Sequence, residues 1–230
     1  CKGSGMIHPN MSTMLGFITT DIAISRALLQ EALSEDVKDT FNMVSVDGDT
    51  STNDTLVVLA NGLAGNAEIT EKSAAYDSFC EALDYVNTCL ARKMAGDGEG
   101  ATALFETTVV NAATKQEART LAKSVIGSSL CKAAIYGHDA NFGRFLCALG
   151  YSGVKFDPEK VELFFESRAG KMLIYKDGAA TDYSEEQATK ILSEPEVTVL
   201  VDMKMGTETA TAWGCDLTYD YVKINADYRS

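Results

Sequence analysis

The chain has 230 residues, a formal net charge of −13 and a pI near 4.6. This acidity excludes a protein that binds nucleic acid through the phosphate backbone, because no basic face exists to release counterions, and it disfavours an anionic membrane surface. The length is enough for one large domain or two small ones, and the apolar residues, 46% of the chain, are enough for a sizeable core.

Membrane-spanning and zinc-binding classes are also not expected. No run of about 18 apolar residues is present, and no signal peptide is visible. The six cysteines form no CxxC pair, and only His8 and His138 are available as further ligands, so we expect no metal site. Cysteines scattered at this density suggest buried thiols in a reducing compartment.

Strands and helices alternate in the first half of the chain. A long helix is predicted over 71–100, where apolar residues recur at helical spacing and Gly96 is a stop signal. The apolar stripe comprises Ala75, Phe79, Ala82, Leu83, Val86 and Leu90. The other predicted elements are an amphipathic helix after a strand end in 19–43, strand–loop–strand in 44–62, and a strand in 103–113.

The second half continues the alternation. One or two helices are predicted over 114–137, a helix and turn over 141–153, and short strands over 161–180. A small helix over 184–194 has Ser184 as its candidate N-cap. The final segment, 196–230, is predicted to end as a strand. The class is therefore mixed α/β, with loops long enough to carry a site.

The stretch "KGSGMIHPNMSTMLGF" (2–17) precedes these elements and is too rich in glycine for an ordinary helix or strand. Thr13 in it is a candidate nucleophile. A threonine hydroxyl needs a base, and the threonine's own α-amine can serve once the Ser12–Thr13 bond is cut, since its pKa of about 7.7–8.0 suits that role. A Ser-Thr pair in a loop is more often a cap or turn former, so the pair alone does not show that Thr13 is a nucleophile.

Several motifs together resemble one family. They are "KGSGMIHPNMSTMLGFITTD" (2–21), "VDGDTSTNDT" (46–55), "DGEGAT" (97–102), "GHDANFGR" (137–144) and the terminal "DLTYDYVKINADYRS" (216–230). In this order and over the whole chain they are similar to the ornithine acetyltransferases, the bifunctional glutamate N-acetyltransferases of arginine biosynthesis (ArgJ family).

The resemblance implies roles for particular residues. Thr13 matches the nucleophile and Ser12–Thr13 the autolytic bond. The matching substrate-binding residues are Lys2, Thr13, Glu99, Asn225 and Ser230. A lysine can pair with a substrate carboxylate, and a glutamate with an ammonium or α-amide. Each of these charges, taken without its motif, would be interpreted as a solvated surface group.

The resemblance also implies the organisation of the protein. Residues 1–12 match the tail of an α chain, and 13–230 match a complete β chain of an α2β2 assembly. The oxyanion hole is expected in the α chain. The fold is expected to be the DmpA/ArgJ-like self-cleaving N-terminal-nucleophile fold, with mixed sheets and helices packed between and around them, as in the aminopeptidases that share this architecture.

The implied activity is ping-pong transfer of an acetyl group from N-acetylornithine to glutamate, with ornithine released. No cofactor is expected, apart from acetyl-CoA as a co-substrate in bifunctional members. The alternatives are an N-terminal-nucleophile amidase or aminopeptidase, and an unprocessed or truncated fragment without activity. The expected location is a bacterial cytoplasm, or the mitochondrial matrix if the source is fungal.

Some features depart from the family or stay ambiguous. Ser12 stands where alanine is usual, Ala103 replaces a lysine, and Ala140 and Phe142 replace residues of the usual "DPNWGR". "DGEGAT" could be a phosphate cradle, but it lacks the P-loop lysine spacing and carries two acids. "GDTSTND" is either a self-satisfied polar turn or a support of the site. Asn141 and Arg144 either tie down a loop or touch substrate, and His138 is expected to be structural.

Overall fold

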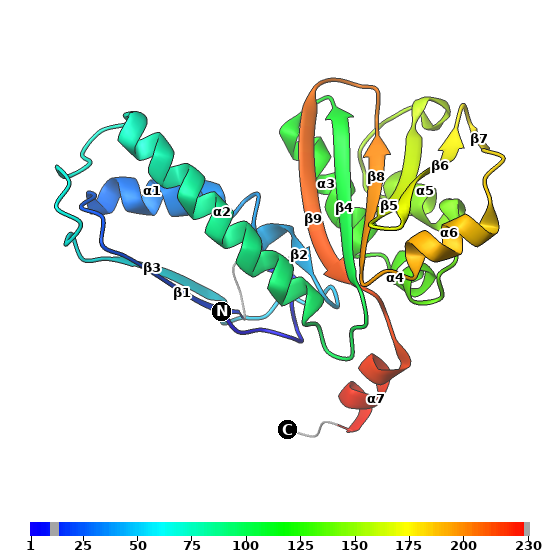
Figure 1. Cartoon of the computed structure of the whole chain (residues 1–230), viewed down its shortest axis with the longest axis horizontal. Coiled ribbons are helices and arrows are strands. Elements are labelled where there is room, and N and C mark those ends of the chain that lie inside the picture. The colour runs from blue at the N-terminus through cyan, green and yellow to red at the C-terminus, as the bar shows by residue number, and fades with distance from the viewer. Residues whose placement is uncertain (10–13, 228–230) are drawn as a thin grey trace.

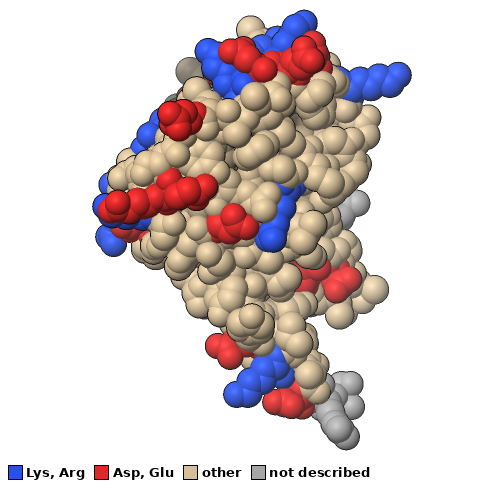
Figure 2. Space-filling view, turned by 90° about the vertical axis from the view of Figure 1, so that its right-hand side faces the viewer, with Lys and Arg blue, Asp and Glu red and all other residues tan. Residues whose placement is uncertain are grey.

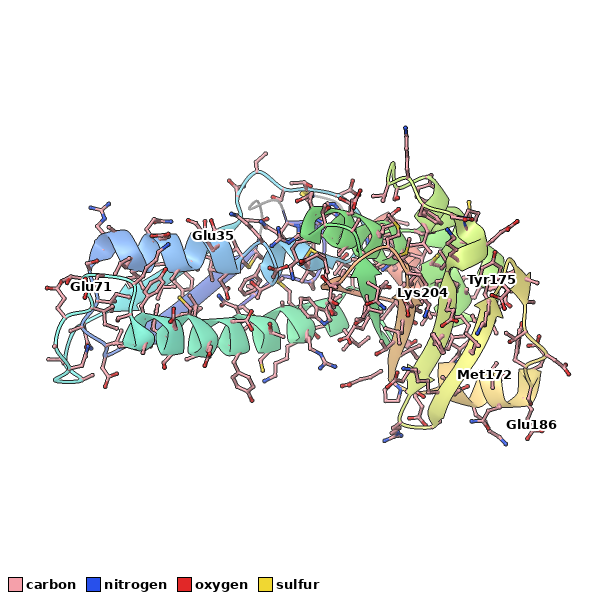
Figure 3. All side chains as sticks on the ribbon, turned by 90° about the horizontal axis from the view of Figure 1, so that it is seen from above. Glu35, Glu71, Met172, Tyr175, Glu186 and Lys204 are labelled. Carbon is pink, nitrogen blue, oxygen red and sulfur yellow. The ribbon has the colours of Figure 1, made fainter. Side chains whose placement is uncertain are left out.

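A computed structural model gives the structure of the chain and describes residues 1–9 and 14–227. The described residues form an elongated molecule with two lobes (Figure 1). Seen from above, Glu71 and Glu186 lie at opposite ends of the long axis (Figure 3). Strands and helices alternate along the chain, which confirms the predicted mixed α/β class.

The first lobe consists of two helices on a two-stranded parallel sheet. The strands are β1 (Leu15–Thr20) and β3 (Thr55–Ala60), and the helices are α1 (Arg26–Asp36) and α2 (Ala74–Gly96). Both helices begin at serine N-caps whose hydroxyls accept a backbone N–H three residues on. The buried residues between helices and sheet are Leu28, Ala32, Ile69, Tyr76 and Leu83.

The other face of this small sheet is apolar and exposed. Phe17 is 62% exposed and Leu59 is 57% exposed, and Leu15 also points outward. No element of the described chain covers this face in Figure 1. Because parallel strands are normally covered on both faces, the first lobe has the surface of an incomplete layer.

Among the described residues, the second lobe is built on a seven-stranded mixed sheet in the order β2-β9-β4-β8-β5-β6-β7. The central β4 runs parallel to β8 and antiparallel to β9. The strands are β2 (Val44–Ser45), β4 (Leu104–Ala112), β5 (Glu162–Ser167), β6 (Gly170–Lys176), β7 (Ala179–Ala180), β8 (Glu196–Asp202) and β9 (Glu208–Cys215).

Helices pack on this sheet around an aromatic core. Phe145 meets both Phe105 and Phe165 edge-on, with ring centroids 6.2 and 5.2 Å away, and all three rings are buried. Helix α3 packs on β4 and β9, and α6 on β5 and β6. The helices are α3 (Lys115–Ile126), α4 (Ser129–Tyr136), α5 (Phe142–Gly150) and α6 (Glu185–Leu192), with short 3-10 turns η1 (Phe41–Met43) and η2 (Pro158–Lys160).

Most predicted elements are confirmed, including the Ser184 N-cap, whose hydroxyl accepts the N–H of Gln187. The predicted terminal strand is wrong, because Tyr219–Asp227 forms the helix α7. Alternating Tyr, Val and Ile favour a strand, but α7 lies apart from both sheets (Figure 1). Without a strand to pair with, a helix satisfies the backbone internally.

The predicted apolar stripe of the long helix is also partly wrong. Leu83 is buried, but Ala75, Ala82 and Val86 are exposed. The residues that α2 does bury are Tyr76, Leu83, Asn87, Ala91, Met94 and Ala95. The helix crosses from one lobe to the other, so its buried face is set by two different sets of neighbours and not by one continuous stripe.

The surface is mixed in charge. Acidic and basic side chains are interspersed on the face shown in Figure 2, without a field of one sign. In the described part of the chain, no helix is both long and apolar enough to cross a membrane. The six cysteines are free, and the expectation of buried thiols is met by Cys131 and Cys215 but not by the exposed Cys1 and Cys147.

Candidate active site

Glu99 lies in the loop that follows α2 and meets two other parts of the chain. Its backbone N–H donates to the Ser4 carbonyl (2.9 Å), and its carboxylate accepts from Asn225 Nδ2 (2.9 Å). A Cβ added at Gly5 would lie 2.5 Å from the Glu99 carboxyl carbon, so a larger residue there would displace the Glu99 carboxylate from its present position. The structure therefore brings Glu99 together with Asn225 and with the segment that begins at Lys2.

Lys2 is held through its backbone while its side chain is free. Its N–H donates to the Leu15 carbonyl (2.8 Å), and the Leu15 N–H donates back (3.0 Å). Among the described residues its ammonium has no hydrogen-bond or ion-pair partner, and it is exposed. It borders a cavity of about 470 Å³ shared with Met94 and Asp97. An ammonium in this position can pair with the carboxylate of a ligand.

The loop carrying Glu99 is anchored by the buried carboxylate of Asp216. This carboxylate accepts the N–H groups of Thr102 (2.8 Å) and Ala103 (3.1 Å), and it also accepts the Thr102 hydroxyl. Asp216 is 3% exposed. Because a buried charge is tolerated only when it is hydrogen-bonded, the loop and Asp216 stabilise one another.

Thr218 connects the same loop to the helix that carries Asn225. Its hydroxyl donates to the Gly100 carbonyl (2.7 Å) and accepts the Tyr221 N–H (3.2 Å) in the first turn of α7. The Thr218 hydroxyl thus links the Glu99 loop to the first turn of α7 and helps to place Glu99 next to Asn225. This contact also explains how a projecting helix keeps a defined position.

We expect Asp216→Ala to lower the free energy of unfolding by at least about 3 kcal/mol, because it orphans several donors that now bond to a charged acceptor. Urea denaturation followed by circular dichroism measures the change. The matched control is Asp220→Ala, which removes an exposed carboxylate four residues further on. Equal unfolding midpoints for the two variants would contradict the anchoring role.

Sequence reasoning missed Asp216 and Thr218 as supports of the site. Asp216 and Thr102 are 114 residues apart in the chain, so no local pattern signals their contact. Lys132 was missed too, although a lysine within an apolar helix is a signal. It is 4% exposed and donates to the Cys215 carbonyl, which fixes the end of β9 next to Asp216.

Three predicted site residues, Ser12, Thr13 and Ser230, lie outside the described residues. The predicted scissile bond and nucleophile therefore stay predictions. The described chain approaches them closely in sequence on both sides. Met14 is buried, and its carbonyl accepts the N–H of Thr55 (2.6 Å).

The polar loop "GDTSTND" lies against the segment that precedes this bond. His8 is half-buried, with its Nδ1 2.9 Å from the Ser45 hydroxyl. Burial lowers the pKa of His8, and the charge of Lys123 lowers it further, so the ring is neutral near pH 7. Burial also lowers the pKa of Lys123 to about 8. Within the loop, the Thr50 hydroxyl donates to the His8 carbonyl (2.9 Å), so the loop supports the segment before the predicted cut and is more than a self-satisfied turn.

The remaining motif residues tie down a loop. Arg144 donates to the Leu130 carbonyl (3.2 Å), and the amide of Asn141 donates to Asp139 (3.3 Å). His138 is exposed in the turn after α4, with a positive φ of 52°. These contacts favour the structural interpretation of "GHDANFGR".

A larger cleft, of about 1010 Å³, lies elsewhere, and it contains none of Lys2, Glu99 or Asn225. Most of its charged residues are paired, as Arg92 is with Glu196 (3.2 Å) and Arg168 with Glu194, so we assign it no role. In the part of the chain that the structure describes, no group of three or more His, Cys, Asp or Glu residues could hold a metal ion.

The fold and the site together define a mixed α/β protein in which a loop carboxylate and a helix amide face a glycine-rich N-terminal segment. Comparison with known proteins identifies the group more closely. The chain is 53% identical to the arginine biosynthesis bifunctional protein ArgJ of Thermotoga neapolitana, and 55% identical to that of Symbiobacterium thermophilum. Each alignment covers the whole chain but only 58% and 56% of those relatives.

A solved structure is similar as well. The crystal structure of arginine biosynthesis bifunctional protein ArgJ from Bacillus halodurans matches with a TM-score of 0.89 and 47% identity, over 94% of this chain and 100% of that one. The sequence model of the ArgJ family matches residues 1–230. The chain belongs to the ArgJ family, which confirms the resemblance seen in its motifs and the expected fold. It spans a little over half the length of these curated relatives.

Proposed function

We propose that this chain is the β part of a glutamate N-acetyltransferase of arginine biosynthesis, together with the tail of the α part. The observation that carries the proposal is the ArgJ family match over the entire chain, with relatives above 50% identity named as bifunctional arginine biosynthesis proteins. The contact between Glu99 and Asn225, two residues that the family motifs mark as substrate-binding, supports it.

The proposed division of the chain lies between Ser12 and Thr13. Residues 1–12 are the tail of the α chain and 13–230 are the β chain. The resemblance of residues 2–21 to the family's self-cleavage segment supports this division.

Self-cleavage needs only the chain and water. The Thr13 hydroxyl attacks the Ser12 carbonyl carbon, the C–N bond breaks, and an ester forms while the Thr13 nitrogen takes up the proton. Water then hydrolyses the ester, which frees a Ser12 carboxylate and the Thr13 hydroxyl. The new α-amine of Thr13 is the base that the hydroxyl requires in the next reaction.

Acetyl transfer follows in two half-reactions. The Thr13 hydroxyl gives its proton to the α-amine and attacks the acetyl carbonyl of N-acetylornithine, and the amide bond breaks as ornithine leaves with that proton. The amino group of glutamate then attacks the acetyl-threonine ester, which restores the hydroxyl. Each tetrahedral intermediate needs oxyanion donors, worth about 3–4 kcal/mol apiece.

Both substrates are amino acids, and the site offers matching charges. The uncommitted Lys2 ammonium suits a carboxylate, and Glu99, held by Asn225, suits an ammonium or an amide N–H. Ser230 is the remaining proposed contact. Acetyl-CoA is a second acetyl donor if this protein, like its named relatives, is bifunctional. The cytoplasm is the proposed location.

The proposed partner is the α chain, in an α2β2 assembly. It supplies the oxyanion hole, for which this chain provides no matching motif. The exposed apolar face of β1 and β3, with Phe17 and Leu59, supports the view that a partner covers this sheet. The chain alone is therefore expected to be inactive.

An acetylornithine assay with and without glutamate tests the proposal, with the α and β parts produced together. Formation of acetylglutamate, with ornithine released first in the absence of glutamate, is the expected result. Release of acetate alone, unaffected by glutamate, would instead identify an N-terminal-nucleophile hydrolase. No reaction with either substrate would leave the chain a non-catalytic fragment.

A further inference from the structure

Residues 6–8 lie against the loop 45–50 in the manner of a bound peptide. The Met6 N–H donates to Asp47 Oδ2 (2.6 Å) and the Ile7 N–H to Asp47 Oδ1 (3.1 Å). The Ile7 carbonyl accepts the Val46 N–H (2.7 Å). One carboxylate thus holds two successive backbone donors with separate oxygens.

The backbone at Met6 is shaped for this carboxylate. Met6 has a φ of +53°, in the left-handed region that non-glycine residues seldom adopt. Successive N–H groups around such a residue form a concave anion site, here filled by Asp47. The same carboxylate accepts the Asp49 N–H (3.1 Å), which holds the loop in its own turn. The unusual backbone and the acid therefore stabilise one another.

Two more contacts between the loop 45–50 and this segment involve His8. The Thr50 hydroxyl donates to the His8 carbonyl (2.9 Å), and the Ser45 hydroxyl lies 2.9 Å from His8 Nδ1. Ile7 is 1% exposed, so its side chain is anchored in the core as well. The chain is therefore fixed from residue 6 to residue 8 by a loop about 40 positions away.

The far side of the predicted cut is fixed too. Met14 is buried and bonded to Thr55, and Leu15 pairs with Lys2. Only residues 9–13 separate these two held segments. An intramolecular attack gains its rate from the orientation of the segments that carry its reacting groups.

We infer that Asp47 is a positioning residue for self-cleavage: by holding residues 6–7 it fixes the chain before the proposed cut, as Met14 and Leu15 are fixed after it. The inference rests on the proposed function, since it presumes that cut. A residue that served only overall stability would not affect the cleavage rate of a folded precursor. Nothing in the family match assigns a role to this carboxylate.

The test follows cleavage of the full precursor, which is this chain with its α part, after synthesis in a cell-free translation mixture. Intact mass at timed intervals gives the fraction cut. Asp47→Asn is expected to slow cleavage by about tenfold or more, because it weakens charge-assisted hydrogen bonds. Asp47→Glu should restore part of the rate. The matched control is Asp49→Asn, whose exposed carboxylate accepts no hydrogen bond from the described residues, and it should cleave at the wild-type rate.

The outcomes separate the two ideas. A wild-type precursor that never cleaves would overturn the proposed function and this inference together. Cleavage of Asp47→Asn at the wild-type rate would overturn the inference alone. Should Asp47→Asn fail to fold by circular dichroism, the exposed Thr50→Val decides, since it removes only the His8 contact. Slower cleavage of that variant supports the inference, and an unchanged rate refutes it.

Discussion

We expect a precursor with Thr13→Ala to remain a single chain and to transfer no acetyl group. Alanine has no hydroxyl to attack the Ser12 carbonyl, and without the cut no α-amine appears to act as base. Acetyl transfer should fall at least about 10⁴-fold, since loss of the nucleophile in a covalent mechanism leaves only binding and oxyanion stabilisation. Intact mass and acetylglutamate formation measure the two effects.

Two further variants make this result specific. Thr13→Ser keeps a hydroxyl and should still be cut, more slowly. Thr19→Ala is the matched control, because it removes an exposed threonine hydroxyl from β1, six positions further along the chain. Complete cleavage and normal acetyl transfer in Thr13→Ala would show that Thr13 is not the nucleophile.

The second large effect is expected at Glu99. Glu99→Gln keeps the size of the side chain but removes the charge that is proposed to meet the substrate. We expect kcat/KM to fall about 30-fold or more, as loss of one partner of a hydrogen-bonded charge pair costs about 2 kcal/mol or more. The loss should appear mainly in KM if the group binds both ground and transition states.

Steady-state rates of the assembled enzyme with varied acetylornithine and varied glutamate measure this effect. The control is Glu71→Gln, an exposed glutamate at the far end of the first lobe (Figure 3). Unchanged kinetics in Glu99→Gln would show that the Asn225 contact serves the structure and not the substrate.

Much of the fold could be predicted because its elements carry local signals. The Ser184 cap and the stop near Gly96 are predicted from the residue types at the helix ends, and both agree with the structure. The error at Tyr219–Asp227 has a general cause. Alternating apolar residues form a strand only where a sheet edge is close enough to pair with. The local sequence does not show how far the segment lies from a sheet edge.

Part of the candidate site was also predictable. The family motifs mark Glu99 and Asn225, which lie 126 residues apart in sequence, and the structure places them 2.9 Å from one another. Asp216 and Asp47 could not be found in this way. Each is one acid among 33 in the chain, and only the folded backbone aims particular N–H groups at these two.

The order of residues alone thus established the mixed α/β class, the family and the candidate nucleophile, because each depends on residue types at short, fixed spacing. Tertiary structure decided which face of α2 is buried, that Tyr219–Asp227 is a helix, and which carboxylates hold the glycine-rich segment. Those outcomes depend on contacts between residues far apart in the chain. Such contacts stabilise the fold only when buried donors and acceptors pair with each other, so no local sequence pattern predicts them.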